Sequence, residues 1–295
     1  MSAPQAIEIV EVGPRDGLQN EPRAIPTADK IALVDALSAT GLRRIEAAAF
    51  VSPKAVPQMA DGAAVMAGIA RCPGVRYAAL APNLRGFEAA SAAGVDEVAV
   101  FAAASEAFSR ANINATIDES LARFVSVAAA AREAGLALRG YVSTVVVCPY
   151  AGPVPPAAVA RVVEALFALG CGEVSLGDTT GRGTPETVDA MLGAVLDAAP
   201  AAQLAGHFHD TNGRALESVA TAYARGIAVF DAAAGGLGGC PFAPGASGNL
   251  ATGALVDWAA ARGIATGVDR AALAAAERLA TSLREPRDVE PADAG

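Results

Sequence analysis

The feature that most constrains the fold is a repeated alternation of short apolar runs with longer amphipathic stretches. Eight such units can be counted along the 295 residues. Repeated strand–helix units build parallel sheets, and eight of them close into a (β/α)8 barrel of the TIM type. The candidate strands are 7–12, 44–48, 76–81, 97–101, 137–146, 173–177, 204–209 and 229–233. We therefore predict an α/β protein built as a closed barrel.

Glycines and helix-starting residues mark the boundaries of these units. Thr27, Pro156 and the pair Thr184-Pro185 stand where helices are expected to begin. A glycine follows each of six amphipathic segments and predicts a left-handed helix end: Gly41, Gly94, Gly135, Gly170, Gly226 and Gly263. Periodicity alone also allows an open doubly wound sheet, but the first turn, GPRDGLQN, is not a dinucleotide-binding GxGxxG.

The C-terminal part of the chain adds a helix to the eight units. An amphipathic stretch from Asp269 to Leu283 follows the last glycine stop. We predict that residues 1–283 form a single barrel domain. The remaining REPRDVEPADAG, residues 284–295, is charged and offers little to bury, so a disordered tail is expected.

Composition limits the possible partners. A net charge of −9 disfavours nucleic acid and anionic membranes, both of which require a positive face. The chain has no leader pattern and no apolar run of about 18 residues, so we expect a cytoplasmic protein that is not in a membrane. The four cysteines lack CxxC spacing, which favours reduced thiols. The expected partners are a small-molecule substrate and a second copy in a homodimer.

The two histidines of the chain lie in one tripeptide, His207-Phe208-His209, at the end of the seventh candidate strand. Side chains alternate along a strand, so both imidazoles should point to the same face. Imidazole is the commonest metal ligand, which makes this pair a candidate metal site. The alternative is two barrel-interior histidines satisfied by hydrogen bonds.

Other polar candidates also lie where strands end. Arg15 and Asp16 follow the first strand, Glu46 lies on the second, and Asp178 follows the sixth. Barrel enzymes carry their catalytic groups at the C-terminal ends of the strands. The eighth strand lies beside the first in a closed barrel. Units six, seven, eight, one and two should therefore form one contiguous arc, together with the loop 235–249.

Four of these residues make a plausible metal-ligand set: Asp16, His207, His209 and Asn249. A mixed nitrogen and oxygen set without thiolate suits Mg²⁺ or Mn²⁺ with open positions for substrate oxygens. Asp210 can replace or support a ligand. Structural alternatives stay open, because Asp16 can cap a turn, Asn249 can cap the following helix and Asp178 can hold its own turn.

The glycine-rich loop GGLGGCPFAPGASGN contains one reactive group, Cys240, which is either a small packed residue or an acid and proton donor. Lysine chemistry is disfavoured, because Lys30 opens a helix and Lys54 lies in a loop, whereas a Schiff-base aldolase needs a lysine on a strand. A Ser-His-Asp hydrolase would have to take one of the paired histidines.

Several motifs together carry a resemblance to a known family. With GPRDGLQNE, FVSPKAVPQM, SLGDTTG, HFHDTNG and AGGLGGCPFAPGASGNLAT, the chain resembles the hydroxymethylglutaryl-CoA lyases, within the metal-dependent lyase and synthase barrels. The resemblance runs from about Ile7 to Leu283. One departure is Gly253, since members of this family continue with an acidic residue after NLAT.

The resemblance implies cleavage of 3-hydroxy-3-methylglutaryl-CoA to acetyl-CoA and acetoacetate. It also implies the roles of particular residues. Asp16, His207, His209 and Asn249 take the metal positions; Arg15, Asp16, Cys240, Glu46 and Asp178 the catalytic ones; and Arg15, Gln19 and Arg23 contact the acyl-CoA. Three alternatives remain: a lyase for a longer isohexenyl-type thioester, a Claisen synthase joining an acyl-CoA to a 2-oxo acid, and an inactive metal-binding scaffold.

Overall fold

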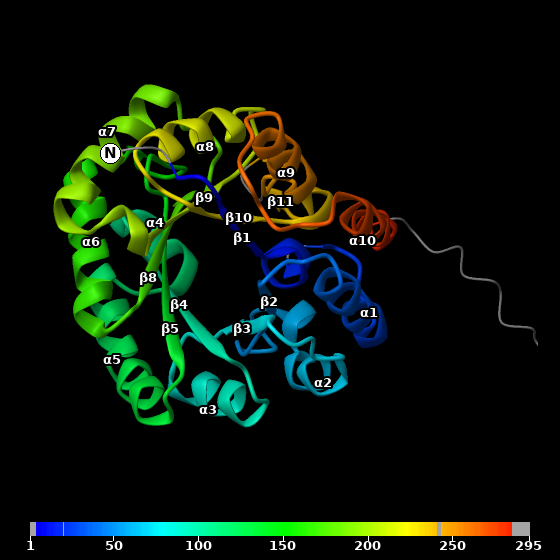
Figure 1. The fold of residues 1–295 in the computed structure, drawn as a ribbon. Coiled ribbons are helices and arrows are strands. Elements are labelled where there is room, and N and C mark those ends of the chain that lie inside the picture. Colours follow the sequence, from blue (N-terminus) through cyan, green and yellow to red (C-terminus); the bar gives the residue numbers. More distant parts are fainter. Residues whose placement is uncertain (1–3, 20, 241–242, 285–295) are drawn as a thin grey trace, which may run out of the picture.

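The computed structural model describes residues 4–19, 21–240 and 243–284, without the side chains of 239–247. Eight parallel strands close into a barrel in the order β1-β10-β9-β8-β5-β4-β3-β2 (Figure 1). They are β1 (Glu8–Glu11), β2 (Arg44–Ala49), β3 (Arg76–Leu80), β4 (Glu97–Ala103), β5 (Ala137–Ser143), β8 (Glu173–Asp178), β9 (Leu204–Phe208) and β10 (Val229–Ala232). The predicted fold class is confirmed, and each predicted strand matches one barrel strand.

One predicted strand is too long. The apolar run after residue 137 was expected to continue to Val146, but β5 ends at Ser143. Thr144 has a φ of +59°, which is incompatible with a strand, and the chain turns there. The next residues, Val145 and Val146, are buried in the loop, which is why hydrophobicity alone did not mark the end of the strand.

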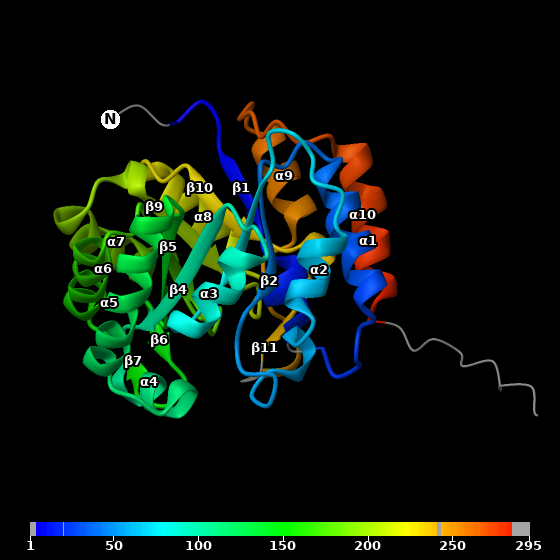
Figure 2. The same cartoon turned by 90° about the horizontal axis from the view of Figure 1, so that it is seen from below.

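Helices surround the barrel (Figure 2). They are α1 (Thr27–Ser38), α2 (Gly62–Gly68), α3 (Leu84–Ala92), α4 (Glu106–Ile113), α5 (Ile117–Ala134), α6 (Pro156–Leu169), α7 (Pro185–Ala198), α8 (Ala215–Ala224), α9 (Thr252–Ala260) and α10 (Arg270–Ser282). The fourth unit carries an extra helix, α4, and a small hairpin, β6 (Val147–Cys148) with β7 (Gly152–Pro153), follows β5. The predicted C-terminal helix is α10, which lies beside α1.

The helix boundaries follow the local signals. The six predicted stop glycines all have positive φ, from +66° at Gly135 to +107° at Gly170. Such angles cost glycine little, because it has no Cβ. Thr184 caps α7 by accepting a hydrogen bond from the backbone of Thr187. Asp269 caps α10 in the same way, through the amides of Ala271 and Ala272.

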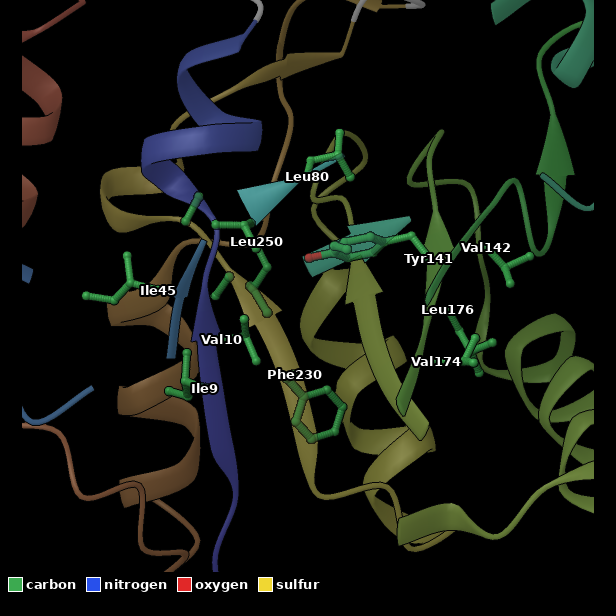
Figure 3. Close-up of a cluster of buried hydrophobic side chains, with 14 of the residues drawn as sticks. Ile9, Val10, Ile45, Leu80, Tyr141, Val142, Val174, Leu176, Phe230 and Leu250 are labelled. Atoms are coloured by element: carbon green, nitrogen blue, oxygen red, sulfur yellow. The ribbon is translucent and has the colours of Figure 1, made fainter. Parts of the chain in front are cut away.

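One hydrophobic core joins the strands to the helices. Ile9 of β1 is paired with Phe230 of β10, and both are buried (Figure 3). Inside the barrel, however, charged residues are also buried, including Arg139 and Asp231. Among the described residues, none of the helices combines the length and apolar character that crossing a membrane requires.

Candidate active site

Arg15 and Asp16 lie in the turn that leaves β1. This turn, η1 (Gly13–Gly17), is a single π-helical turn, a local irregularity that often marks functional sites. It directs both side chains toward the C-terminal ends of the strands. Arg15 is buried, and its Nη1 donates to Asp16 Oδ1 at 2.7 Å. The two residues therefore form an ion pair at the C-terminal end of the barrel.

The histidine pair faces this ion pair. His207 is on β9 and His209 follows the strand directly, so both imidazoles point to the same side. Their Nε2 atoms lie 3.3 Å apart, and His207 Nε2 is 3.9 Å from Asp16 Oδ2. Ligand atoms of Asp16, His207 and His209 all lie within 4.8 Å of one another. The structure thus brings together three of the four predicted metal ligands.

The fourth predicted ligand, Asn249, is held beside them by the backbone. It forms an isolated β-bridge with His209, and the amide of Asp210 donates to the carbonyl of Gly248 at 2.7 Å. Asn249 Nδ2 donates to Asp16 Oδ2 at 2.9 Å. The cap of α9 is Ala251, so the helix-cap alternative for Asn249 is not what the structure contains.

Asp231 is a functional residue that the sequence analysis missed. Its Oδ2 lies 3.0 Å from His207 Nδ1, and Arg139 holds both of its carboxylate oxygens. Ser175 donates a further hydrogen bond to it at 2.8 Å. A carboxylate on one imidazole nitrogen directs the lone pair of the other nitrogen toward a metal. A charged residue in the apolar strand segment VFDA was the available signal.

The charges of the cluster are set by these neighbours. Burial alone would raise the pKa of Asp16, but Arg15 and the histidines outweigh it and hold the pKa at about 2. Burial and the nearby His207 lower the pKa of His209 to about 4. Burial would also lower the pKa of His207, but the hydrogen bond and charge of Asp231 reverse this and raise it. At neutral pH the site holds an ionised carboxylate beside a neutral imidazole.

Glu46 locks the Arg15 guanidinium in place. Arg15 Nε donates to Glu46 Oε2 at 2.6 Å, and both side chains are almost fully buried. Within the described part of the chain, Arg15 Nη2 donates no hydrogen bond, so this edge of the fork is available to a ligand. Tyr141 lies beneath, with its ring 5.6 Å from Arg15 Cζ and edge-on to His207.

Asp178 organises its own loop. It is buried at the end of β8, where its Oδ2 accepts a hydrogen bond from the Gly183 amide at 2.7 Å. The Thr180 hydroxyl approaches the other oxygen at 3.4 Å. Burial raises the pKa of Asp178 against these hydrogen bonds. The contacts match the turn-holding alternative, and a catalytic role stays a prediction. Asp210 similarly holds the start of α8 by accepting from the Ala215 amide.

Glu11 is a second supporting residue that the sequence analysis missed. Its Oε1 accepts hydrogen bonds from the amides of Gly13, at 2.8 Å, and Ala234, at 2.9 Å. The Thr252 hydroxyl donates to Oε2 at 2.7 Å. One buried carboxylate therefore joins the turn after β1, the turn after β10 and the start of α9.

The remaining predicted residues lie farther from the cluster or outside the description. Arg23 Nη2 donates to the carbonyl of Leu283 at 2.7 Å, so its guanidinium is directed at the end of α10. Gln19 is half-buried just beyond η1. Cys240 belongs to the short strand β11 (Gly239–Cys240), which pairs with β12 (Ala243–Ser247), but its side chain lies outside the described residues.

The donor set fits a divalent cation. One carboxylate and two imidazoles converge, and Asp231 prepares His207 to ligate through Nε2. The short separation between the two Nε2 atoms is favourable only if a proton or a cation lies between them. Oxygen and nitrogen donors without a thiolate suit a cation that keeps open positions for substrate.

Comparisons with known proteins agree with this architecture. A family model described as HMGL-like matches residues 6–280. The mitochondrial hydroxymethylglutaryl-CoA lyase of Bos taurus is 56% identical over 266 residues, which cover 90% of this chain and 82% of that protein. The 3-hydroxy-3-isohexenylglutaryl-CoA/hydroxy-methylglutaryl-CoA lyase of Pseudomonas aeruginosa is 55% identical over 284 residues, covering 96% of this chain and 95% of that one.

A solved structure is also similar over almost the whole chain. The HMG-CoA lyase from Brucella melitensis superposes with a TM-score of 0.95 at 60% sequence identity. The match covers 96% of this chain and 100% of that one. Fold and sequence therefore point to the same family.

Proposed function

Because the chain belongs to the HMGL-like family, we propose that it is a carbon–carbon lyase that cleaves 3-hydroxy-3-methylglutaryl-CoA to acetyl-CoA and acetoacetate. The observation that carries the proposal is the convergence of Asp16, His207 and His209 beside the open edge of Arg15. This places a candidate cation site and a fixed positive charge side by side at one end of the barrel, as cleavage beside a thioester requires.

The reaction has four changes that the chain must promote. The C3 hydroxyl loses its proton, the C2–C3 bond breaks to leave a ketone, and its electrons pass into the thioester as an enolate. The enolate carbon then takes up a proton to give acetyl-CoA. Asp16 is the ionised carboxylate best placed to accept the hydroxyl proton. A carboxylate with a pKa of about 2 is a weak base, so the hydroxyl must first be made more acidic.

Arg15 acts on the enolate. Its Nε and Nη1 are committed to Glu46 and Asp16, which fixes the plane of the guanidinium and leaves Nη2 to donate to the thioester oxygen. A donor that is already oriented before the charge develops stabilises it without reorganisation. We assign Cys240, or a water that it holds, to protonation of the enolate carbon.

Asp16, His207, His209 and Asn249 would hold the cation, which we propose is Mg²⁺ or Mn²⁺. When bound, such an ion supplies a Lewis acid that lowers the pKa of the coordinated hydroxyl. The chain's own contribution is orientation: Asp231 fixes the His207 ring, and the β-bridge to His209 fixes Asn249. We further propose that the protein is cytoplasmic and works as a homodimer.

A second candidate substrate is the longer isohexenyl thioester. The Pseudomonas aeruginosa relative is named for both the isohexenylglutaryl and the methylglutaryl substrates, and it matches this chain over 96% of its length. The proposed cation site and Arg15 would act on the same reacting atoms in either substrate. Only the pocket for the C3 substituent would differ.

The test is turnover with each thioester. Purified protein with Mg²⁺ or Mn²⁺ should release acetoacetate and acetyl-CoA from 3-hydroxy-3-methylglutaryl-CoA, and a His209→Ala variant should lose this activity. Absence of product with both metals would refute the lyase, and full turnover by the variant would refute the proposed cation site. The ratio of kcat/KM for the two thioesters assigns the acyl chain.

A further inference from the structure

The helix α10 is not needed to close the barrel, yet its C-terminal end contacts two loops of the active site. Arg284, which was expected to open the tail, lies just after the C-cap residue Leu283, and its backbone amide donates to the carbonyl of Thr281 at 3.0 Å. Its Nη2 donates to the carbonyls of Gly236, at 3.0 Å, and Gly238, at 2.8 Å. Its Nε donates to Glu21 Oε1 at 3.1 Å.

The first of these loops is the turn after β10. Gly236 and Gly238 have φ of +64° and +104°, so the backbone there is in a conformation that few side chains tolerate. Asn249 Nδ2 donates to the carbonyl of Leu237 at 3.2 Å. A Cβ on Gly238 would lie only 2.9 Å from that same Nδ2. The position of this turn therefore determines where the Asn249 amide can lie.

The second loop leaves β1 and carries Asp16. Gly17 packs so closely on the first loop that a Cβ there would lie 2.6 Å from Leu237 Cβ. Glu21 ends this segment with only 12% of its side chain exposed. Two residues farther on, Arg23 holds the Leu283 carbonyl. The end of α10 is thus bonded to both loops: Arg284 donates hydrogen bonds to each of them, and the Leu283 carbonyl accepts one from Arg23.

We propose that Arg284 is a positioning residue for the proposed cation site formed by Asp16, His207, His209 and Asn249. By bonding two carbonyls of the turn that contacts Asn249 and a carboxylate of the loop that carries Asp16, it fixes the separation between these two segments. Arginine suits this task because its planar fork reaches several acceptors at once. The inference rests on the proposed cation site. The competing explanation is that Arg284 only anchors the end of α10.

The test compares two arginines of the same region. Arg284→Met removes every donor while keeping an apolar stem. The matched control is Arg270→Met, at the start of α10, where Arg270 pairs with Asp257 at 2.9 Å and Glu277 at 3.0 Å. The two side chains are similarly exposed, at 36% and 43%. Arg284→Met removes one partly exposed ion pair and Arg270→Met removes two, but only the Arg284 side chain bonds the site loops.

Two readouts separate positioning from anchoring. In Arg284→Met, hydrogen exchange at the amides of Gly236 and Leu237 should be about tenfold faster, as expected when a charge-assisted hydrogen bond is lost. The Kd for Mn²⁺, measured by titration of the full chain, should rise about three- to tenfold, somewhat less than for residues bonded directly to a ligand. In Arg284→Lys, the exchange rate and the Kd for Mn²⁺ should lie between those of the wild type and Arg284→Met. Arg270→Met should change neither the exchange rate nor the Kd.

Each outcome decides the matter. Unchanged exchange in Arg284→Met would overturn the proposal, as would faster exchange with an unchanged Kd for Mn²⁺. Equal effects in Arg270→Met would also overturn it, because they would reflect the stability of α10. A wild-type chain that binds no Mn²⁺ refutes the proposed cation site itself, and with it the role given to Arg284. A wild-type chain that binds Mn²⁺ but shows no lyase activity would contradict only the proposed reaction.

Discussion

At the scale of single residues, the site depends on how its charged side chains hold one another. Asp231 touches neither Asp16 nor the mouth of the barrel, but it determines which nitrogen of His207 carries the proton. Arg139 in turn fixes Asp231 with two hydrogen bonds from its guanidinium. Removing one partner of a buried ion pair strongly destabilises the folded protein, because the other charge is left buried without a partner.

Asp231→Asn should therefore weaken the site without replacing any of the proposed ligands. Loss of the carboxylate removes the constraint on the His207 ring, so Mn²⁺ affinity and kcat should each fall about 10- to 100-fold. Isothermal titration and steady-state kinetics measure the two effects. The control is Asp189→Asn, which breaks a surface pair with Arg225 at 2.6 Å and should change neither. Wild-type Mn²⁺ affinity in Asp231→Asn would contradict the orienting role.

Arg15→Lys tests whether geometry or charge matters at the open edge. Lysine keeps the positive charge but cannot bond Glu46 and Asp16 while also presenting a third donor in a fixed plane. We expect kcat to fall about 10- to 100-fold, with KM changed less, because the lost interaction belongs to the developing enolate. A rise in KM with kcat unchanged would instead indicate a role in substrate binding alone.

At the scale of elements, the sequence was most informative where local physics dominates. Strand positions followed from short apolar runs, and Gly135 and Gly170 ended their helices in the left-handed conformation. The early turn at Thr144 was missed, because its strain is maintained by the surrounding fold and a threonine gives no local sign of it.

The site was predictable in part for a related reason. The adjacency of η1 to β9 and β10 follows once eight strands are closed into a barrel, so Asp16 and the histidines could be grouped in advance. The partners Arg139 and Asp231 are 92 positions apart, and no local pattern records that they meet inside the barrel. Glu11 was missed similarly, since its three donors come from three separate segments.

Glu11 makes the junction of these elements sensitive to pH. Burial, opposed by its hydrogen bonds, raises the pKa of Glu11 to about 7 from an ordinary value of 4.5. The folded protein therefore keeps a proton that the unfolded chain releases between these two values. Its contribution to stability is complete below about pH 4.5, declines as pH rises to about 7 and is lost above that.

Glu11→Gln should remove this pH dependence. The amide oxygen can still accept from Gly13 and Ala234, but the side chain no longer titrates. The free energy of unfolding of the wild type, relative to the variant, should fall by up to about 3 kcal/mol between pH 4.5 and pH 8. Urea denaturation at several pH values measures the difference. A difference that does not change with pH would mean that Glu11 titrates normally.

At the scale of the whole molecule, closure of the barrel brings the first strand and the last barrel strand, β10, together at one site. Strand β10 pairs with β1 in parallel, from Glu8 with Val229 to Glu11 with Ala232. This closure places Asp16 beside His207 and His209, which come nearly 200 residues later in the sequence. The unfolded chain cannot keep these groups together, so a cation held by them should bind only the folded protein.

Metal binding should therefore stabilise the entire barrel. At a free Mn²⁺ concentration of about 100 times Kd, the gain in unfolding free energy is about 2.7 kcal/mol, which for a domain of this size raises Tm by about 4 °C. Calorimetry of the chelator-treated protein, before and after addition of Mn²⁺, measures this shift. The double variant His207→Ala, His209→Ala should show none, because Asp16 and Asn249 alone offer too few ligands. An equal rise in both proteins would locate the ion elsewhere on the acidic surface, and the histidine pair would then be structural.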